Sequence, residues 1–600
     1  MTIRYAVRPA DPGAHLFHVT VGLERPDPRG QRFVMPAWNP GSYMIREFAR
    51  HVVRLTALAG GRKLRVEKLD KHTWQCARTV EEVTLAYEVY AFDLSVRAAY
   101  LDPEQAFFNG AALLLLPVGR EGEPCRIDIF PPPGVRAGSW QLVTGLKAAR
   151  STRDGSFGTY LAKDYEELID CPVQMGRLAL QRFEVCGVPH RIALSGRVAR
   201  LDLDRVGADL ARLCETQVRM FEPRSRHPPF DRYEFLALAV DDGYGGLEHR
   251  NSSALIFRRD DLPHIGMKEP TEGYRRVLGL VSHEYFHAWN VKRIRPRAFV
   301  PYDLTRENTT RLLWAFEGFT AYYDELMLAR SGLLTQAQYL EELGRTISTV
   351  MQRTGRLKQS LSDSSFDAWI KYYRQDENAP NSVVSYYQKG ALVALALDLA
   401  IRHESGGRRS LDDVMRWLWR GYRAAGPGYP GIGEDGIVEA VVQATGLDLA
   451  RTVHAWTEGT RDPDLATLLQ AVGIRLQRRL ALESPHFALL GLKLQTAGTE
   501  CRVAQVFDGG AAQQAGLAAG DVLVAMDHLR VTPARLDALL ARYAPGDTVQ
   551  VLAFRREELL PFQLKLAAQA PPRFVLEVDE RAGTTAKRNR ARWCGARRGD

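Results

Sequence analysis

The sequence predicts a multidomain α+β protein with a β-rich domain, a mostly helical domain and a smaller domain of strands and short helices. Three observations support this prediction. At 600 residues the chain is too long to form a single hydrophobic core. Strand-like alternation of apolar residues dominates up to about residue 170, and a helical period of three to four replaces it from about residue 200. After about residue 465, short strand-like runs return.

Residues 1–170 are expected to form a β-sandwich. The run "HLFHVTVGLE" alternates apolar and polar residues, and residues 52–69 contain two strand-like runs around Gly60-Gly61, a hairpin signal. Clusters of turn-forming residues such as "RPDPRG" and "PPPG" separate the runs. The segment "WNPGSYMIREFAR", residues 38–50, does not fit a strand and is expected to lie in a surface loop.

Residues 171–465 are expected to form the mostly helical domain. Apolar residues recur there every three or four positions in several segments. These helical segments are 202–222, 272–292, 310–330, 335–354, 385–403, 410–423 and 434–457. Residues 475–570 then alternate short strand-like and helix-like runs, which predicts a third, smaller domain.

The formal charge of +9 does not indicate a nucleic-acid-binding protein. Residues 581–600 alone contribute +6, so the other 580 residues carry only +3. This concentration predicts a nearly neutral body and a basic, disordered tail over residues 576–600. Such a tail could contact an anionic surface, but the chain contains no recognised nucleic-acid-binding module.

The chain is expected to reside in the cytoplasm. No apolar run is long enough to span a bilayer, and the opening "MTIRYAVRPADPG" lacks the apolar core of a secretory signal. The seven cysteines form no C-x-x-C pair and are odd in number. This usage argues against a disulfide framework and fits a reducing compartment.

The stretch "LGLVSHEYFHAWN", residues 278–290, contains the pattern H-E-x-x-H. On a helix, His283 and His287 project from one face, and Glu284 lies between them. This is the arrangement of two zinc-ligating imidazoles with a glutamate beside the metal-bound water. A core helix with hydrogen-bonded histidines is the alternative, but two histidines and a glutamate in one buried turn are costly without a metal.

A zinc ion needs a third protein ligand, and the second helical stretch "LLWAFEGFTAYYDEL" offers one. Glu317 lies there among aromatic and apolar residues, where a carboxylate requires a cation. Two helices that supply His-Glu-His and Glu form the gluzincin arrangement. Asp324 and Glu325 are rival ligands that are expected to face solvent, and the group that orients His283 and His287 remains open.

Three further segments are similar to those of known zinc aminopeptidases. "GYGGLEHRNSSAL", residues 243–255, resembles the Gly-x-Met-Glu-Asn segment of aminopeptidase N-like enzymes. "SYYQKGALVALALDL", residues 385–399, resembles the Tyr-x-Lys-Gly helix start, with Tyr387 in the place of its tyrosine and Tyr386 as a near rival. "WNPGSYMIREFAR" resembles a signature of the N-terminal domain of one such family.

Together with H-E-x-x-H, these segments resemble the PDZ-containing glycyl aminopeptidases, metallopeptidase family sixty-one. The resemblance implies an N-terminal β-sandwich, a thermolysin-like catalytic domain, a PDZ domain and one zinc ion per chain. It also implies removal of Gly or Ala from peptides with a free N-terminus. In that family an edge strand lies along the substrate, and the resemblance assigns Gly246 and Leu247 to this strand. It also implies that Glu248 holds the α-amino group of the substrate and that Tyr387 faces the scissile carbonyl.

"LLGLKL" followed by "VFDGGAAQQAGLAAGD" resembles PDZ domains of bacterial proteases. The resemblance implies that Leu490, Gly491 and Leu492 form the loop whose backbone N–H groups face a peptide C-terminus. A bound peptide would then add a strand to the sheet edge. Leu489 stands where the usual loop has its first glycine, which argues against capture of a peptide carboxylate. The alternative is that the domain binds no peptide and only braces the catalytic domain.

Two other functions are weighed against the aminopeptidase. One is a PDZ-assisted zinc endopeptidase, against which Glu248 argues. The other is a non-catalytic peptide-binding scaffold, which predicts an incomplete zinc site. The presence of His283, His287, Glu317, Glu284 and Tyr387 argues against the scaffold.

Overall fold

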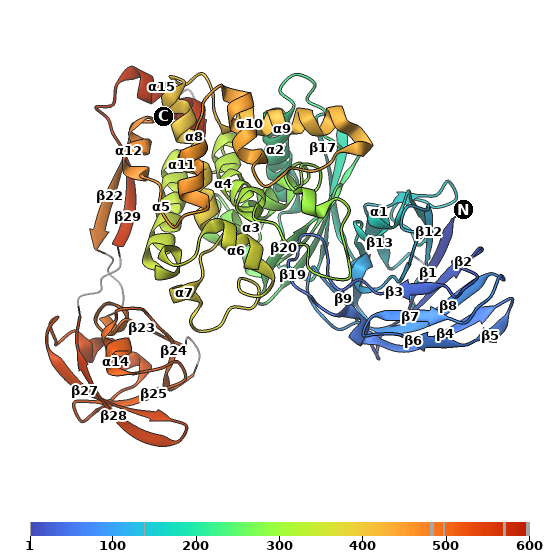
Figure 1. Cartoon of the computed structure of the whole chain (residues 1–600), viewed down its shortest axis with the longest axis horizontal. Helices are drawn as coiled ribbons and strands as arrows, with labels where there is room; N and C mark the ends of the chain where they lie inside the picture. Colours follow the sequence, from blue (N-terminus) through green and yellow to red (C-terminus); the bar gives the residue numbers. More distant parts are fainter. Residues whose placement is uncertain (1, 137, 481–484, 496–497, 568–571, 596–600) are drawn as a thin grey trace. The chain divides into compact units, whose positions relative to one another are not determined.

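The computed structural model describes residues 2–136, 138–480, 485–495, 498–567 and 572–595 (Figure 1). They form two compact units. The first contains Met1–Thr310, Tyr323–Leu334 and Asp412–Ala440, and the second contains Arg311–Tyr322, Thr335–Leu411 and Val441–Asp600. The helix α4, Leu313–Ser331, begins in the second unit and ends in the first.

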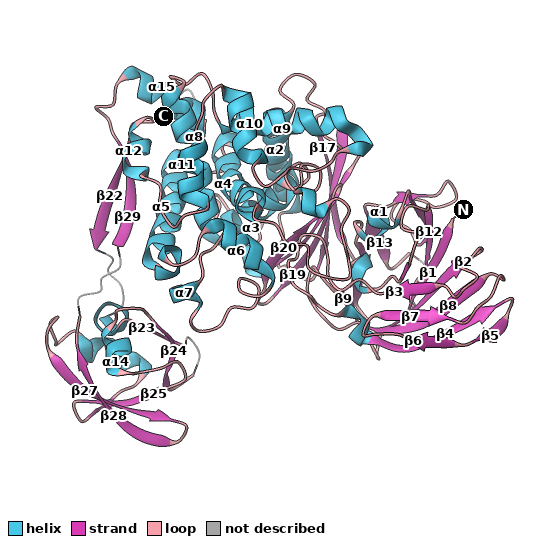
Figure 2. Ribbon diagram, in the orientation of Figure 1, coloured by secondary structure: helices cyan, strands magenta, loops and turns pink. Residues whose placement is uncertain are grey.

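The N-terminal part of the first unit is β-rich, as expected (Figure 2). Its largest sheet has the described strands in the order β14 (Lys147–Ala148), β15 (Gly158–Ala162), β12 (Cys125–Ile129), β1 (Ile3–Asp11), β2 (Leu16–Leu23), β8 (Val83–Tyr90), β4 (Val52–Ala59) and β5 (Arg62–Leu64). Two smaller sheets have the orders β13 (Gln141–Thr144), β16 (Val173–Gly176), β10 (Gln105–Phe108), β9 (Ala99–Leu101) and β11 (Leu116–Pro117), β3 (Arg32–Val34), β7 (Thr73–Cys76), β6 (Val66–Lys68). All three sheets contribute side chains to one hydrophobic core, for example Val19, Met175 and Phe33.

A five-stranded sheet follows in the first unit. Its order is β17 (Ala179–Val185), β18 (Val188–Ser195), β19 (Tyr233–Val240), β21 (Ser252–Arg258) and β20 (Tyr244–Glu248). The three central strands are parallel, which accounts for the nearly continuous apolar sequence of β19, and β20 is an antiparallel edge strand. The helix α2, Leu203–Phe221, connects β18 to β19.

The helix α3, Glu272–Phe286, contacts β20, β21 and α2. Thr271 caps its N-terminus, since its hydroxyl accepts a hydrogen bond from the N–H of Tyr274 at 3.1 Å. The helix ends at Phe286, earlier than the expected residue 292. Val291 has φ of +100°, a conformation that no α-helix accepts, and its N–H donates to the Ile294 carbonyl.

The second unit is mostly helical between residues 335 and 470. Its helices include α5 (Gln336–Gln352), α6 (Leu361–Phe366), α7 (Ala379–Ser382), α8 (Gln388–Glu404), α11 (Ala450–Thr457) and α12 (Leu465–Gln470). The helix α9 (Leu411–Ala425) lies almost wholly in the first unit, and α10 (Gly436–Thr445) is divided between the two units. Every helix in the described ranges is too short or too polar to cross a lipid bilayer.

Residues 486–567 form a small domain with a hydrophobic core of its own. Its sheet has the described strands β23 (Leu492–Leu494), β24 (Cys501–Val506), β25 (Val522–Met526), β27 (Thr548–Arg555) and β28 (Glu558–Lys565) in that order, and β26 (Leu529–Arg530) pairs with β25. Two short helices accompany it, α13 (Ala511–Ala515) and α14 (Pro533–Leu540).

The expected disordered tail is wrong for residues 576–595. Strand β29, Pro572–Val578, pairs antiparallel with β22, Ile474–Leu480, and α15, Thr584–Cys594, follows. Trp593 is fully buried, and its indole N–H donates to the Tyr322 hydroxyl at 2.8 Å. The basic residues of α15 lie largely on its solvent side, and their number gives the segment the composition of a disordered tail. Residues 596–600 lie outside the described residues.

Candidate metal and peptide site

The two histidines of the H-E-x-x-H pattern lie at the C-terminal end of α3. His283 is in the last turn, His287 is the C-cap, and their ring centroids are 4.7 Å apart. The Nδ1 of His283 is 3.0 Å from Oδ2 of Asp324, and the Nδ1 of His287 is 2.8 Å from the Asn290 carbonyl oxygen. Because both partners are acceptors, each neutral ring carries its proton on Nδ1 and keeps the lone pair of Nε2 for a metal.

Asp324 was expected to face solvent, and this expectation is wrong. Its side chain is only 16% exposed, and it receives the hydrogen bond from His283. Its backbone carbonyl also accepts a hydrogen bond from the Ser282 hydroxyl at 2.7 Å. Asp324 is therefore the group that orients His283, and the carbonyl of Asn290 orients His287.

Glu317 lies on α4 seven residues before Asp324, which places both carboxylates on one face of the helix, two turns apart. Glu317 is 2% exposed. One donor atom from each of His283, His287 and Glu317 can be chosen so that all three lie within 4.8 Å of one another. Two imidazoles and one carboxylate form a known catalytic zinc set, so the residues present fit this metal.

Close contact between two helices fixes the surroundings of Glu317 in the second unit. A Cβ atom on Gly318 would lie 2.6 Å from the Cα of Gly390, so the backbones of α4 and α8 touch at these glycines. Tyr387 is the residue that precedes α8. It is half-buried, whereas its neighbour Tyr386 is fully buried, so Tyr387 is the more accessible of the two tyrosines.

The edge strand β20 presents alternate backbone groups to its open edge. The His249 N–H donates to the Ser252 carbonyl in the turn between β20 and β21. In an antiparallel pair only every second residue bonds to the neighbouring strand, so this bond fixes which residues of β20 bond to β21. Leu247 and Gly245 therefore bond to β21, whereas the N–H and C=O groups of Gly246 and Glu248 point away from it. Gly246 lies against Glu284, because a Cβ atom at Gly246 would be 2.0 Å from Oε1 of that residue.

Glu248 is 3% exposed, and its Oε1 has no hydrogen-bond partner among the described residues. One donor atom from each of Glu248, Glu284 and His287 lies within 4.8 Å of the others. A Cβ atom at Gly41, whose φ is +98°, would lie 2.3 Å from Glu248 Oε1. Glycine at position 41 is therefore needed to leave room for the carboxylate. The ammonium of Lys292 is near enough to interact electrostatically with Glu248, although it does not satisfy Oε1.

The segment 38–50 was expected to form a surface loop, and the structure contradicts this. Trp38 and Tyr43 are fully buried, and the indole N–H of Trp38 donates to the Asp303 carbonyl at 2.9 Å. The segment brings Gly41 against Glu248. Its aromatic residues signalled burial, but the local pattern could not reveal a partner more than 200 residues away.

A buried ion network lies directly after Glu248. Asp170 contacts the Lys292 ammonium at 2.6 Å, the ring Nδ1 of His249 at 3.2 Å and the Arg250 N–H at 3.0 Å. Burial alone would raise the pKa of Asp170, but Lys292, His249 and Arg250 outweigh it and hold that pKa well below its usual range. Asp170 thus links the turn after β20 to the loop after α3.

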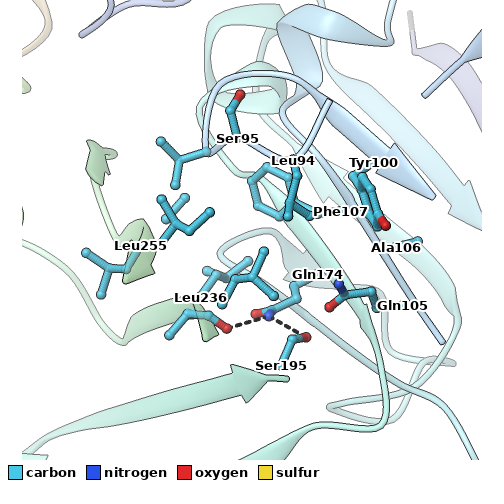
Figure 3. A pocket seen from close by; sticks show the side chains of 15 residues that line it. Leu94, Ser95, Tyr100, Gln105, Ala106, Phe107, Gln174, Ser195, Leu236 and Leu255 are labelled. Carbon is cyan, nitrogen blue, oxygen red and sulfur yellow. Dashed lines mark hydrogen bonds between the residues drawn. The ribbon is translucent and has the colours of Figure 1, made fainter. Parts of the chain in front are cut away.

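An apolar pocket on the other face of the sheet is separate from this site (Figure 3). The amide of Gln174 lies at this pocket and donates to the Ser195 hydroxyl and to the Ala237 carbonyl, each at 2.9 Å. None of the residues that line the pocket is a histidine, cysteine, carboxylate or cation. The pocket is therefore a packing feature between β-rich segments of the first unit.

In the small domain, Gly491 has φ of +68°, and Leu490 and Leu492 on either side are fully buried. The N–H of Gly491 donates to the Phe487 carbonyl at 3.0 Å. That amide is therefore used within the loop itself. The strand β23, which begins at Leu492, is an edge strand of its sheet.

The chain is similar in sequence and in fold to known proteins. Residues 4–177 match the peptidase M61 N-terminal domain, and residues 276–393 match the M61 glycyl aminopeptidase model. The chain is 39% identical to an aminopeptidase N family protein from Idiomarina loihiensis, covering 99% of this chain and 100% of that one, with a TM-score of 0.93. An M1 zinc metallopeptidase from Deinococcus radiodurans is 13% identical over 78% of this chain and 95% of its own, with a TM-score of 0.48. No curated protein matches the chain.

Proposed function

Since this chain belongs to the M61 glycyl aminopeptidase family, we propose that it is a zinc-dependent aminopeptidase that removes glycine or alanine from the N-terminus of peptides. The observation that carries the proposal is the buried carboxylate of Glu248 beside Glu284 and His287. A carboxylate in that position fits a substrate ammonium and sets the cleavage one residue from the N-terminus.

His283, His287 and Glu317 would hold one zinc ion per chain. When bound, the ion supplies Lewis acidity, which polarises the scissile carbonyl and lowers the pKa of a coordinated water to about 7. Asp324 and the Asn290 carbonyl keep the two imidazoles in the tautomer that coordinates through Nε2. Two histidines and one carboxylate match the three protein ligands that catalytic zinc sites use.

Glu284 would act as general base and then as general acid. Its carboxylate takes a proton from the attacking water and passes it to the leaving amine. Gly246 supports this role because the absence of a side chain there leaves room for the Glu284 carboxylate beside the edge strand. The substrate backbone would lie along the open edge of β20, where Gly246 and Leu247 lie.

Tyr387 would donate its hydroxyl hydrogen to the oxygen of the scissile carbonyl as negative charge develops on it. Its partial exposure and its position at the start of α8 support this choice over Tyr386. Loss of one such donor costs on the order of 10²–10³ in rate. A Tyr387→Phe variant should therefore bind substrate and turn it over slowly.

The decisive experiment compares a glycine-initiated peptide with its N-acetylated form, using zinc-loaded protein and the variant Glu248→Gln. We expect the wild type to release one glycine from the free peptide and to leave the acetylated peptide intact. Glu248→Gln should lose most of this discrimination. Internal cleavage of both peptides would indicate an endopeptidase, and no cleavage of any peptide would indicate a peptide-binding scaffold.

For residues 486–567 we propose a PDZ domain that binds an extended peptide at the edge strand β23. The separate core, the five-stranded order and the glycine at position 491 support this proposal. Because the Gly491 N–H already donates within the loop and Leu490 ends a π-helix, a peptide carboxylate would depend on the N–H of Leu492.

A further inference from the structure

An arginine that the catalytic scheme does not use lies at the open edge of β20, beside the central residue of this strand. Arg97, from a loop of the β-rich part of the first unit, donates from Nη2 to the Gly246 carbonyl at 3.2 Å. This carbonyl is one of the groups that point away from β21. Arg97 therefore occupies a backbone acceptor that a bound peptide strand would otherwise use.

The loop of Arg97 is fixed on both sides. Val96 packs with Leu247 and Ala254 in a small buried cluster, on the face of the sheet opposite Glu248. The backbone carbonyl of Arg97 accepts a hydrogen bond from the Asn39 side chain, and its N–H donates to the Ser95 hydroxyl at 3.3 Å. Figure 3 shows Ser95 and Leu94 of this loop beside the apolar pocket. The guanidinium is thus held in place relative to β20.

The guanidinium retains unused donors. Its Nε is buried and has no hydrogen-bond partner, and no carboxylate of the described residues forms an ion pair with it. Its Nη1 lies 3.7 Å from the position that a Cβ atom of Gly245 would take, and no side chain fills that position. Because Nε is buried and Nη2 is used, Nη1 is the donor that remains for a ligand, and a charge-assisted hydrogen bond from a guanidinium favours a carboxylate.

The spacing selects the length of the ligand. Glu248 and Gly246 are two residues apart on an extended strand, about 6.8 Å. An extended dipeptide spans about 7 Å from its amine to its carboxylate. A dipeptide whose ammonium lies at Glu248 and whose chain runs antiparallel to β20 therefore places its C-terminal carboxylate near Arg97.

We propose that Arg97 recognises the C-terminal carboxylate of the substrate, so that the enzyme prefers dipeptides with a free C-terminus. This inference rests on the proposed aminopeptidase function and deepens it by assigning the substrate class. Arg97 acts twice in this scheme: it takes the Gly246 carbonyl, which limits strand pairing by longer peptides, and it neutralises the carboxylate of short ones.

The test measures kcat/KM for glycyl-leucine and for glycyl-leucinamide, which differ only in the C-terminal carboxylate. We expect the wild type to prefer the free acid by roughly 10- to 100-fold, mostly through KM, because the carboxylate gains charge-assisted hydrogen bonds. Arg97→Gln should bring the ratio close to one, and Arg97→Lys should retain part of it. Because each ratio is taken within one variant, partial misfolding cannot imitate the effect.

A second variant separates this inference from the function on which it rests. Glu248→Gln should slow both substrates while it leaves the ratio of acid to amide near the wild-type value. A wild-type ratio near one, or a ratio that Arg97→Gln does not change, would overturn the role of Arg97 and leave the aminopeptidase in place. If the wild type released glycine from neither these substrates nor longer peptides, the proposed function would fall, and the role of Arg97 with it.

Discussion

Asp324 on α4 accepts a hydrogen bond from His283 on α3, with 3.0 Å between Oδ2 and Nδ1. The backbone carbonyl of Asp324 also accepts from the Ser282 hydroxyl, so one residue holds the last turn of α3 at two points. Glu317 lies two helical turns earlier on the same face of α4. A single helix therefore supplies a proposed metal ligand and the carboxylate that orients another ligand.

Removal of the Asp324 carboxylate should weaken zinc binding without removing a ligand. In Asp324→Ala, we expect the zinc dissociation constant to rise about 10- to 100-fold, because His283 loses the partner that fixes its tautomer and orientation. Competition with a fluorescent chelator measures this constant. The neighbouring Glu325→Gln is the matched control and should bind zinc as the wild type does. Equal affinities for all three proteins would contradict the role of Asp324.

A methyl group at Gly246 should displace the proposed general base. The Cβ atom of Gly246→Ala would lie 2.0 Å from Glu284 Oε1, so the carboxylate has to move. We expect kcat to fall by at least 10²-fold while the zinc content measured by mass spectrometry stays at one per chain. Gly245→Ala is the control on the same strand, since its nearest contacts are at 3.7 Å. Assayed with a C-terminally amidated substrate, which does not use Arg97, it should keep most of its activity.

The buried pair of Lys292 and Asp170 should matter far more to stability than an exposed pair of similar length. Lys292→Met leaves Asp170 buried and short of its closest cation, which should destabilise the fold by about 3–5 kcal/mol. The exposed pair of Lys71 and Glu47, 2.8 Å apart, provides the comparison, and Lys71→Met should cost less than about 1 kcal/mol. Urea unfolding of both variants gives the two values, and similar losses would contradict this reading of the network.

His190 should make stability depend on pH. It is 2% exposed, and burial lowers its pKa to about 4 from an ordinary value of 6.5. Between these values the unfolded chain binds a proton that the folded chain does not, so this contribution is complete above pH 6.5 and is lost as the pH falls toward 4. The loss amounts to about 3 kcal/mol over that range.

The variant His190→Gln tests this dependence. Its unfolding free energy should change less between pH 4.5 and 7 than that of the wild type, because the titrating ring is gone. His227 is exposed, so His227→Gln should keep the wild-type slope. An unchanged slope in His190→Gln would show that other groups govern the acid sensitivity.

The sequence predicted the parts of the site that depend on local spacing. His283, Glu284 and His287 follow from the period of one helix, and Glu317 follows from a carboxylate in an apolar helix. The role of Asp324 was missed because Asp324 and Glu325 were both expected to face solvent, although the seven-residue separation of Asp324 from Glu317 was visible in the sequence. Gly41, Arg97 and Asp170 could not be predicted, because they meet β20 only through folding across more than 70 residues.

The C-terminal helix was missed for a different reason. Its Lys and Arg content has the composition of a disordered tail, and composition does not distinguish a solvated chain from a helix with one buried face. Trp593 and Cys594 supply that buried face. A single tryptophan in a basic segment is thus a better indication of docking than the net charge of the segment.

The most direct test of the central proposal is a zinc titration of metal-free protein, with release of glycine from a free glycine-initiated peptide as the readout. We predict that activity rises to a plateau at one zinc ion per chain, that Glu317→Gln needs far more zinc, and that Glu284→Gln binds one zinc ion and stays inactive. Full activity of the metal-free protein, or normal activity of Glu284→Gln, would contradict the proposed site.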